Sequence, residues 1–438
     1  MTWRAHALVL SILLMVASAS AADLPGCDFD GSFSHDIAIG VPGEKLVASG
    51  EGAVSVIYDD QSADDELLHQ GLDGTTVAKL GDGFGEALAC GDFNQDQFDD
   101  LAVGVPGRDV NGYQDNGTVW VFFGGKRGFE TKDGVLAEQV QIWDEVQIVG
   151  TSGDRHGFGQ TLEAGDFDND GCDDLAIAAP GADFEGEDAA GAVYVLYSDC
   201  ELGLRVEEDK GFYLNQNMDG LWDQPEAGDG FGSALQSGDF NGDQFDDLAV
   251  GVPGEDEFTV SLLENVGSVN VFYGGSDGLY VGNVPLTETI FQNTMKDGLQ
   301  EGDQFGFSLA STDFDADGFD DLAVGVPFED LELVVSSVID AGAVNVLYGT
   351  SCGLLCQQSR FDFWHQDVEI DGQEIDEVAE AGDQFGYALS VGDLCQFSTF
   401  GSWYLEDGTF HDSHTWSQEN KDINDDAEVD DRFGEAIG

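Results

Sequence analysis

Residues 91–107 read Gly-Asp-Phe-Asn-Gln-Asp-Gln-Phe-Asp-Asp-Leu-Ala-Val-Gly-Val-Pro-Gly, and this stretch recurs along the chain. It places oxygen-bearing side chains at positions 1, 3, 5 and 9 of a loop and then enters a short apolar run. Complete copies span 166–180, 239–253 and 313–327, and a weaker copy spans 28–42. A repeat kept so strictly predicts one structural unit used several times.

The chemistry of the repeated loop favours calcium. Three or four carboxylates within nine residues repel one another, and Ca²⁺ prefers about six to eight hard oxygen ligands in a flexible loop. We predict that the side chains at positions 1, 3, 5 and 9 and the carbonyl at position 7 bind it. The four ligand sets are Asp92, Asn94, Asp96, Phe98 and Asp100; Asp166, Asp168, Asp170, Cys172 and Asp174; Asp239, Asn241, Asp243, Phe245 and Asp247; and Asp313, Asp315, Asp317, Phe319 and Asp321.

The loop differs from an EF-hand, which needs a bidentate Glu at position 12 and flanking helices. Position 12 is Val103, Ile177, Val250 or Val324, each inside a strand-like apolar run. The loop is therefore predicted to lie between strands. Solvated acidic turns are the alternative, but a solvated turn has no reason to keep this spacing four times.

The weaker copy carries Asp28, Asp30, Ser32 and Asp36 at positions 1, 3, 5 and 9. Residues 30–34 also match the Asp-x-Ser-x-Ser pattern of an adhesion-type metal site, but the doubly wound fold that carries such a site is absent. We interpret the copy as a decayed calcium loop. Whether it retains affinity, giving a fifth site, is left open.

The first 22 residues predict a secretory signal peptide. Arg4 precedes the apolar run 7–16, and the small residues 17–22 follow. Residues 23–438 would then form the mature chain, as a single domain. No other segment is apolar for long enough to cross a bilayer, so we expect a secreted protein, extracellular or at the cell surface.

The chain is strongly acidic, with 88 Asp and Glu against 14 Lys and Arg and a formal charge of −74. Such a charge argues against binding nucleic acid or anionic lipid and favours cations or a basic partner. The 42% hydrophobic fraction and 30 Phe argue against disorder. Adaptation to high salt, which would screen the charge, is left open.

Seven cysteines give an odd count in an oxidising compartment. Cys352 with Cys356, and Cys172 with Cys200, are close enough in sequence to pair. Connectivity is not decided by the sequence, and at least one thiol should remain unpaired.

A Phe-Gly pair precedes each complete loop by eight residues. The pairs begin at Phe84, Phe158, Phe231 and Phe305, with further copies at Phe385 and Phe433. Each unit contains four strand-like runs, which in the first complete unit are 87–90, 101–105, 118–123 and a stretch near Trp143. Short strands and abundant glycine favour an all-β fold of blades around an axis.

These motifs, Phe-Gly followed by the Asp-rich loop and then Gly-Val-Pro or Ala-Ala-Pro, resemble the FG-GAP repeats of the integrin α-subunit β-propeller. The resemblance covers essentially all of the mature chain. It implies a β-propeller with Ca²⁺ in hairpin loops on one face and a role in cell adhesion.

Two departures affect the predicted propeller. The loop at 28–36 has no Phe-Gly pair before it, and the chain ends just after Phe433. Joining the two terminal segments in one shared blade closes a ring of about six blades, and a seventh is left open. The module after Phe385 lacks a metal loop and a Pro turn, so we expect this last blade to be degenerate.

No catalytic pattern emerges from the sequence: zinc-type His spacing, a Gly-x-Ser-x-Gly turn and a phosphate-binding Gly loop are all missing. We expect a non-catalytic, calcium-binding adhesion or protein-interaction module whose partner is an extracellular protein or glycan. A carbohydrate-binding or carbohydrate-active propeller is the alternative. The acidic insertions 182–190, 255–266 and 328–340 follow the Pro turn at equivalent points, and we expect them to form the binding rim.

Overall fold

The computed structural model describes most of the chain between residues 27 and 391. The described residues are 12–13, 27–45, 51–58, 65–73, 78–129, 131–132, 135–136, 140–200, 202–207, 210, 212–218, 221, 224–258, 262–279, 287–295, 298–333, 336–355, 360–366, 369–370, 373–374, 379 and 381–391.

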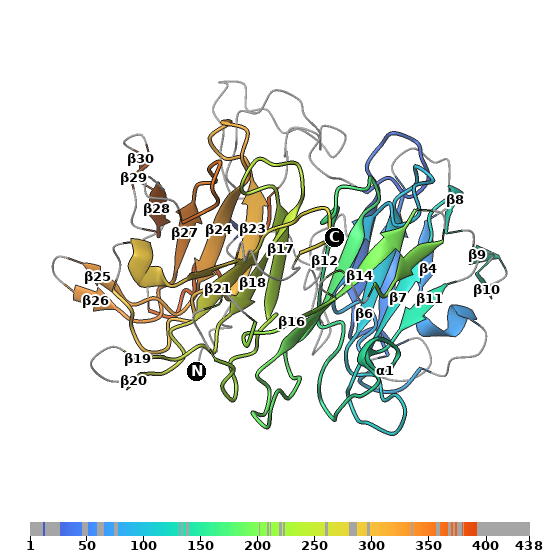
Figure 1. Cartoon of the computed structure of the whole chain (residues 1–438), viewed down its shortest axis with the longest axis horizontal. Coiled ribbons are helices and arrows are strands. Elements are labelled where there is room, and N and C mark those ends of the chain that lie inside the picture. The colour runs from blue at the N-terminus through green and yellow to red at the C-terminus, as the bar shows by residue number, and fades with distance from the viewer. Residues whose placement is uncertain are drawn as a thin grey trace, which may run out of the picture.

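The described residues form an all-β fold, as predicted, and they contain five main antiparallel sheets (Figure 1). The first sheet contains β2 (Ile37–Val41), β3 (Ala53–Ile57) and β4 (Glu66–Leu68). The second has the order β5 (Leu88–Gly91), β6 (Asp100–Val105), β7 (Thr118–Phe122), β11 (Gln141–Trp143). The third has β12 (Thr161–Gly165), β13 (Asp174–Ala179) and β14 (Ala192–Asp199), which pairs with both β15 (Gly203–Arg205) and β16 (Tyr213–Leu214).

The remaining two main sheets repeat the four-strand order. They are β17 (Ala234–Gly238), β18 (Asp247–Val252), β21 (Ser268–Phe272), β22 (Thr287–Ile290), and then β23 (Ser308–Thr312), β24 (Asp321–Val326), β27 (Ala343–Leu347), β28 (Phe361–Trp364). The four strands predicted for each complete module are thus present. The second strand of each is buried along its whole length, as its continuous apolar sequence predicted.

Short helices and strands lie outside the main strands of the five sheets. They comprise the helix α1 (Glu145–Val149), the 3-10 helices η1 (Gln70–Asp73) and η2 (Gln292–Met295), and the strands β1 (Ile12–Leu13), β8 (Lys126–Phe129), β9 (Thr131–Lys132), β10 (Val135–Leu136), β19 (Glu257–Phe258), β20 (Leu262–Leu263), β25 (Leu331–Leu333), β26 (Ser336–Val338), β29 (Glu369–Ile370), β30 (Gln373–Glu374) and β31 (Ala388–Leu389). The hairpins β19–β20 and β25–β26 lie within two of the acidic insertions, at the lower left of Figure 1.

Each of the five Phe-Gly pairs that the structure describes joins its module to the preceding sheet. The glycine before the third strand of one module forms a parallel bridge with the Phe of the next, at Gly52 with Phe84, Gly117 with Phe158, Gly191 with Phe231, Gly267 with Phe305, and Gly342 with Phe385. These glycines have φ between 78° and 90°. A Cβ on Gly191 would lie 2.3 Å from the Phe231 carbonyl oxygen, so glycine is required here.

The hydrophobic cores lie between neighbouring sheets. Phe84, at the start of the second module, is buried against Trp120 and Phe122 and also packs with Val54 of the first sheet. The first strands of successive modules lie side by side, β5 with β12, β12 with β17, and β17 with β23. Each sheet therefore buries its faces against its neighbours, as expected of a repeat architecture.

Disulfides connect distant parts of the chain. The predicted pair Cys172–Cys200 is present, with its Cα atoms 5.7 Å apart. Cys27–Cys90 was not predicted, and it joins the segment before β2 to β5 of the next sheet. Cys352 is also disulfide-bonded, while its predicted partner Cys356 lies outside the described residues.

Several predictions fall on residues that are not described. The proposed signal peptide, residues 1–22, is described only at Ile12–Leu13, which pair in parallel with Ala388–Leu389. The degenerate module beyond residue 391 and the closing segment at Phe433 lie wholly outside. Within the described ranges, no helix is long and apolar enough to cross a membrane.

Candidate metal centres

The Asp-rich loops connect the first and second strands of four sheets. We name them loop A (92–100), loop B (166–174), loop C (239–247) and loop D (313–321), and the weaker copy before β2 is loop N (28–36). In loops B, D and N the carboxylates at positions 1, 3 and 9 converge, each set having ligand atoms within 4.8 Å of one another. These sets are Asp166, Asp168 and Asp174; Asp313, Asp315 and Asp321; and Asp28, Asp30 and Asp36.

All five loops share the folding pattern of their first aspartate. In loop A the Asp92 carboxylate accepts hydrogen bonds from the backbone N–H groups of Asp96, at 3.1 Å, and Gln97, at 3.0 Å. The equivalent bonds recur in loops B, C, D and N. Asn94 accepts from the Asp96 N–H at 3.0 Å, which turns its oxygen toward the same centre. Local hydrogen bonds of this type favour a turn, so the conformation of the loop is determined by residues within the loop.

Position 9 is buried in every loop, at 0 to 1% exposure in loops A to D. In loop A both Asp100 oxygens accept backbone hydrogen bonds, from Phe93 and from Gly124. Burial nevertheless raises the pKa of Asp100, Asp174 and Asp247 to about 9, and that of Asp321 to about 7. A buried carboxylate is disfavoured without a counter-charge, and a divalent cation would supply one. The donor set, hard oxygens alone, fits Ca²⁺.

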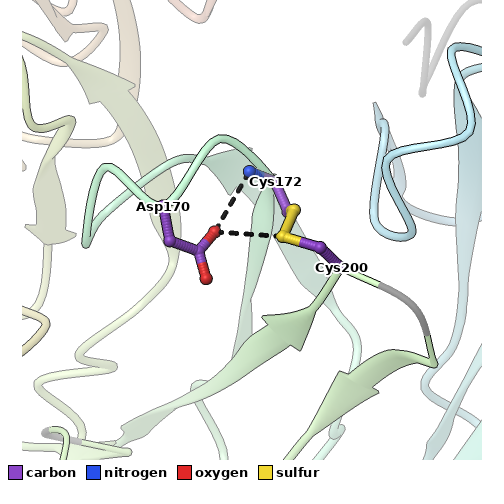
Figure 2. Close-up of side chains that lie close together, drawn as sticks. All are labelled: Asp170, Cys172 and Cys200. Atoms are coloured by element: carbon purple, nitrogen blue, oxygen red, sulfur yellow. Dashed lines mark hydrogen bonds between the residues drawn. A yellow bond between two sulfur atoms is a disulfide. The ribbon is translucent and has the colours of Figure 1, made fainter.

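Position 5 makes a local contact that the sequence did not predict. It belongs to none of the three convergent carboxylate sets. In Figure 2 the Asp170 carboxylate accepts a hydrogen bond from the Cys172 N–H, at 3.1 Å, and lies 3.5 Å from the Cys200 sulfur. The two sulfurs are joined in a disulfide, so this trio is no thiolate metal site. Asp96, Asp243 and Asp317 make the same bond to the N–H of position 7.

Loop N retains the geometry of the complete loops. Asp28 accepts from Ser32 and Phe33, and Asp36 accepts from the Phe29 N–H at 2.9 Å. Its substitution at position 5, Ser32, therefore leaves the convergence of positions 1, 3 and 9 intact. The interpretation of this loop as a decayed calcium loop rested on composition, and its retained affinity stays a prediction.

Sequence reasoning missed the acid at position 8, which links neighbouring loops. The Asp173 carboxylate of loop B accepts from the Asp92 N–H of loop A, and the Asp173 N–H donates to the Asp92 carbonyl. Asp99, Asp246 and Asp320 make the same reciprocal pair with the loop before their own. The sequence signal that could have revealed this role is the pair of consecutive aspartates at positions 8 and 9 of each complete loop. Burial raises the pKa of Asp173 to about 7.

Two basic residues at the loops were also missed. The Lys210 ammonium contacts the Asp168 carboxylate of loop B, and Arg360 lies 3.0 Å from the Asp315 carboxylate of loop D. Each lies beside the outer strand of the sheet that carries its own loop. Lys210 is 42 residues from Asp168 in the chain, and Arg360 is 45 residues from Asp315. Only their rarity, in a chain with 14 basic residues, could have drawn attention to them.

The fold and the loops together define an all-β repeat protein with an acidic turn in each module. The model of the FG-GAP repeat matches residues 84–122, 158–196, 231–271 and 305–347. The chain is an FG-GAP repeat protein that resembles integrin α subunits.

The relatives include proteins of two kinds. Integrin alpha-PS2 of Drosophila melanogaster is 29% identical over 266 residues, covering 58% of this chain and 16% of that protein. Phosphatidylinositol-glycan-specific phospholipase D of Mus musculus is 34% identical over 173 residues, 39% of this chain and 18% of that protein. The chain thus spans less than a fifth of the length of these two relatives.

Among solved structures, a Bacillus licheniformis rhamnogalacturonan lyase is similar at a TM-score of 0.30 and 14% identity, over 67% of this chain and 54% of that one. A score this low supports no argument about fold or activity.

Proposed function

We propose that the chain is a secreted, non-catalytic, calcium-binding β-propeller that serves as an adhesion or protein-interaction module. The relatives motivate the proposal without deciding it, because one is named for an enzymatic activity and another is an integrin. The five sheets, each interlocked with the next by a Phe-Gly pair, support the propeller. Six blades, closed by the two terminal segments, agree with the number of Phe-Gly pairs, and seven is the alternative.

The observation that carries calcium binding is the repetition of one loop geometry in five places. Positions 1 and 9 accept the same backbone hydrogen bonds in each loop, so the carboxylates are oriented before any ligand arrives. Preorganised oxygen ligands lower the ordering cost of binding. The proposed ligands are positions 1, 3 and 9, completed by position 5, the carbonyl of position 7 and water. Loop N makes a fifth site.

Calcium would then act on stability. With a Kd of about 10⁻⁴ M per site, typical of extracellular modules, about 1 mM Ca²⁺ stabilises each site by roughly 1.4 kcal/mol. Several sites together approach the net stability of an ordinary domain. Binding relieves the repulsion among carboxylates within a loop.

The recognition surface is proposed to be the rim formed by the acidic insertions. The second and third strands are antiparallel, so their connections lie at the opposite end of each sheet from the metal loops. The connections after β18 and β24 each form a hairpin, β19–β20 and β25–β26. A rigid sheet that carries variable hairpins is a common basis for recognition.

Thermal unfolding of residues 23–438 in millimolar CaCl₂ and in EDTA tests the proposal. We expect a cooperative transition whose midpoint rises with Ca²⁺, and calorimetric titration should count more than one site. An unchanged midpoint together with no heat of binding would refute the calcium function. For the rim, trimming both hairpins should abolish capture of a partner while leaving the calcium response intact, and unaltered capture would refute that assignment.

A further inference from the structure

Lys210 and Arg360 occupy the same place in their sheets. Lys210 places its ammonium 5.0 Å from the ring centre of Tyr197, and Arg360 places its guanidinium 3.8 Å from that of Tyr348. Tyr197 lies near the end of β14, and Tyr348 directly follows β27. Each cation comes shortly before the outer strand of its sheet, β16 or β28. The aromatic ring and the loop carboxylate therefore hold the cation from two sides.

Each of these cations pairs with the carboxylate at position 3. Lys210 contacts Asp168 and also lies 3.1 Å from Glu207, while Arg360 contacts Asp315 and lies 3.3 Å from Asp362. Burial lowers the pKa of Lys210, but its contacts with Asp168 and Glu207 outweigh burial, and the net direction is upward. Lys210 therefore stays charged at neutral pH.

Loops A and C have a neutral amide at position 3, Asn94 or Asn241, where loops B and D have an aspartate. Lys210 and Arg360 thus each accompany an aspartate at position 3, in loops B and D. Loop N also has an aspartate at position 3, Asp30.

The loops differ in the number of carboxylates at positions 1, 3, 5 and 9. Loops A and C carry three carboxylates at the four side-chain positions, and loop N, with Ser32, also carries three. Loops B and D carry four carboxylates and one paired cation. In loops B and D the cation therefore offsets the fourth carboxylate, and a further acid, Glu207 or Asp362, contacts the same cation.

We propose that Lys210 and Arg360 set the calcium affinity of loops B and D by neutralising the aspartate at position 3. This inference rests on the proposed calcium function of the loops. In the metal-free chain the cation relieves repulsion among four carboxylates. When Ca²⁺ binds, the same cation repels it and competes for the position-3 oxygen, so the affinity stays near that of a loop with three acids.

Loop B offers a charge-swap experiment whose control is built into loops A and C. Calcium affinity is measured by calorimetric titration of the folded chain with CaCl₂, for the wild type, K210M, D168N and the double variant D168N/K210M. Met keeps the apolar stem of the lysine against Tyr197. The double variant gives loop B the side-chain charges of loops A and C.

We expect K210M to tighten calcium binding at one site by about tenfold, because a positive charge that contacts a ligand carboxylate is lost. D168N alone should weaken one site by a similar factor, and D168N/K210M should return to within about threefold of the wild type. In EDTA, K210M should lower the unfolding midpoint while it raises the calcium-dependent increment. A lysine with only a structural role would lower the midpoint without tightening any site, and that result overturns the proposal.

Two further variants keep the inference testable if K210M does not fold. N94D gives loop A four carboxylates without an added cation, so it should tighten one site by about tenfold. R360M should act in the same direction but less strongly, because the Arg360 side chain is 56% exposed against 19% for Lys210. Wild-type calcium binding with no change in N94D and R360M overturns this inference alone. A wild type that binds no calcium overturns the proposed function with it.

Discussion

The Asp173 carboxylate lies 2.8 Å from the backbone nitrogen of Asp92, although 81 residues separate them in the chain. The bond is returned by the backbone, since the Asp173 N–H donates to the Asp92 carbonyl at 3.2 Å. One residue of each of loops A to D therefore completes the hydrogen bonding of the loop before it. The aspartate that would bind metal through its side chain is held by its neighbour through its main chain.

We predict that D173A destabilises the chain by about 1 to 2 kcal/mol, because the Asp92 N–H loses its acceptor in a half-buried position. Calcium affinity at loop A should fall as well, since the backbone of its first ligand is released. Chemical unfolding and calorimetric titration measure the two effects. D188N, a change at an exposed acid in the loop after β13, is the charge-matched control and should leave both unchanged.

The Phe-Gly interlock predicts a steep cost for a side chain at Gly191. G191A places a Cβ 2.3 Å from the Phe231 carbonyl, and a shift of either sheet should cost several kcal/mol. G186A is the matched control, because Gly186 also has positive φ, at 102°, but has no atom within 4 Å of an added Cβ. G186A should cost about 1 kcal/mol, from the backbone conformation alone. Equal unfolding midpoints for the two variants would contradict the interlock.

Glu163, which lies outside the loops, predicts a pH dependence of the stability. Its carboxylate on β12 accepts from the Ser237 hydroxyl at 2.6 Å and the Ser237 N–H at 3.0 Å, on β17 of the next sheet. Burial raises its pKa from 4.5 to about 7, although the Ser237 bonds oppose the shift. The folded chain therefore keeps a proton that the unfolded chain releases. This contribution to stability is complete below pH 4.5 and is lost as the pH rises through 7.

E163Q should remove that component. As the pH is raised from about 4.5 to about 7.5 at fixed CaCl₂, the unfolding free energy of the wild type should fall relative to that of E163Q. E185Q, at an exposed loop residue, serves as the control and should show no such trend. A difference that stays constant across this range would mean that Glu163 does not titrate there.

The Cys172–Cys200 disulfide closes loop B onto the end of β14. C172S/C200S should lower the stability by about 3 kcal/mol, as expected when a cross-link of this span is removed. The Asp170 carboxylate that rests on the disulfide should become less ordered, and calcium binding at one site should weaken. Titration and unfolding of the double variant, compared with oxidised wild type, measure both. If affinity is unchanged while stability falls, the disulfide serves the sheet and not the loop.

The strands were predictable because their signals are local. The run Asp-Leu-Ala-Val-Gly-Val is apolar on both faces, and β6, β18 and β24 are buried on both faces. The turn after Asp92 was predictable for the same reason, since its hydrogen bonds stay within the loop. The repetition also supported the prediction, because a chance arrangement of acids would not recur with the same spacing in four loops.

What could not be predicted depends on contacts between modules or between distant parts of one module. The pairing of Cys27 with Cys90, the partner of Asp173 and the contact of Lys210 with Asp168 each join residues that 42 or more positions separate. The bond from position 5 to the N–H of position 7 is local, but the residue pattern alone did not reveal it. The hydrogen bonds of loop N match those of the complete loops, and this match could not be read from its composition.

The bridges between Gly117 and Phe158, and between Gly191 and Phe231, have a consequence for exchanging parts between such chains. A fragment cut just before a Phe-Gly pair contains a whole sheet but separates the glycine before its third strand from the phenylalanine that covers it. The exchangeable unit is thus displaced from the repeat visible in the sequence. A chimera whose junctions fall between a loop and the following glycine would carry both halves of one interlock from the same parent, whereas a junction between that glycine and its phenylalanine would combine surfaces from two parents.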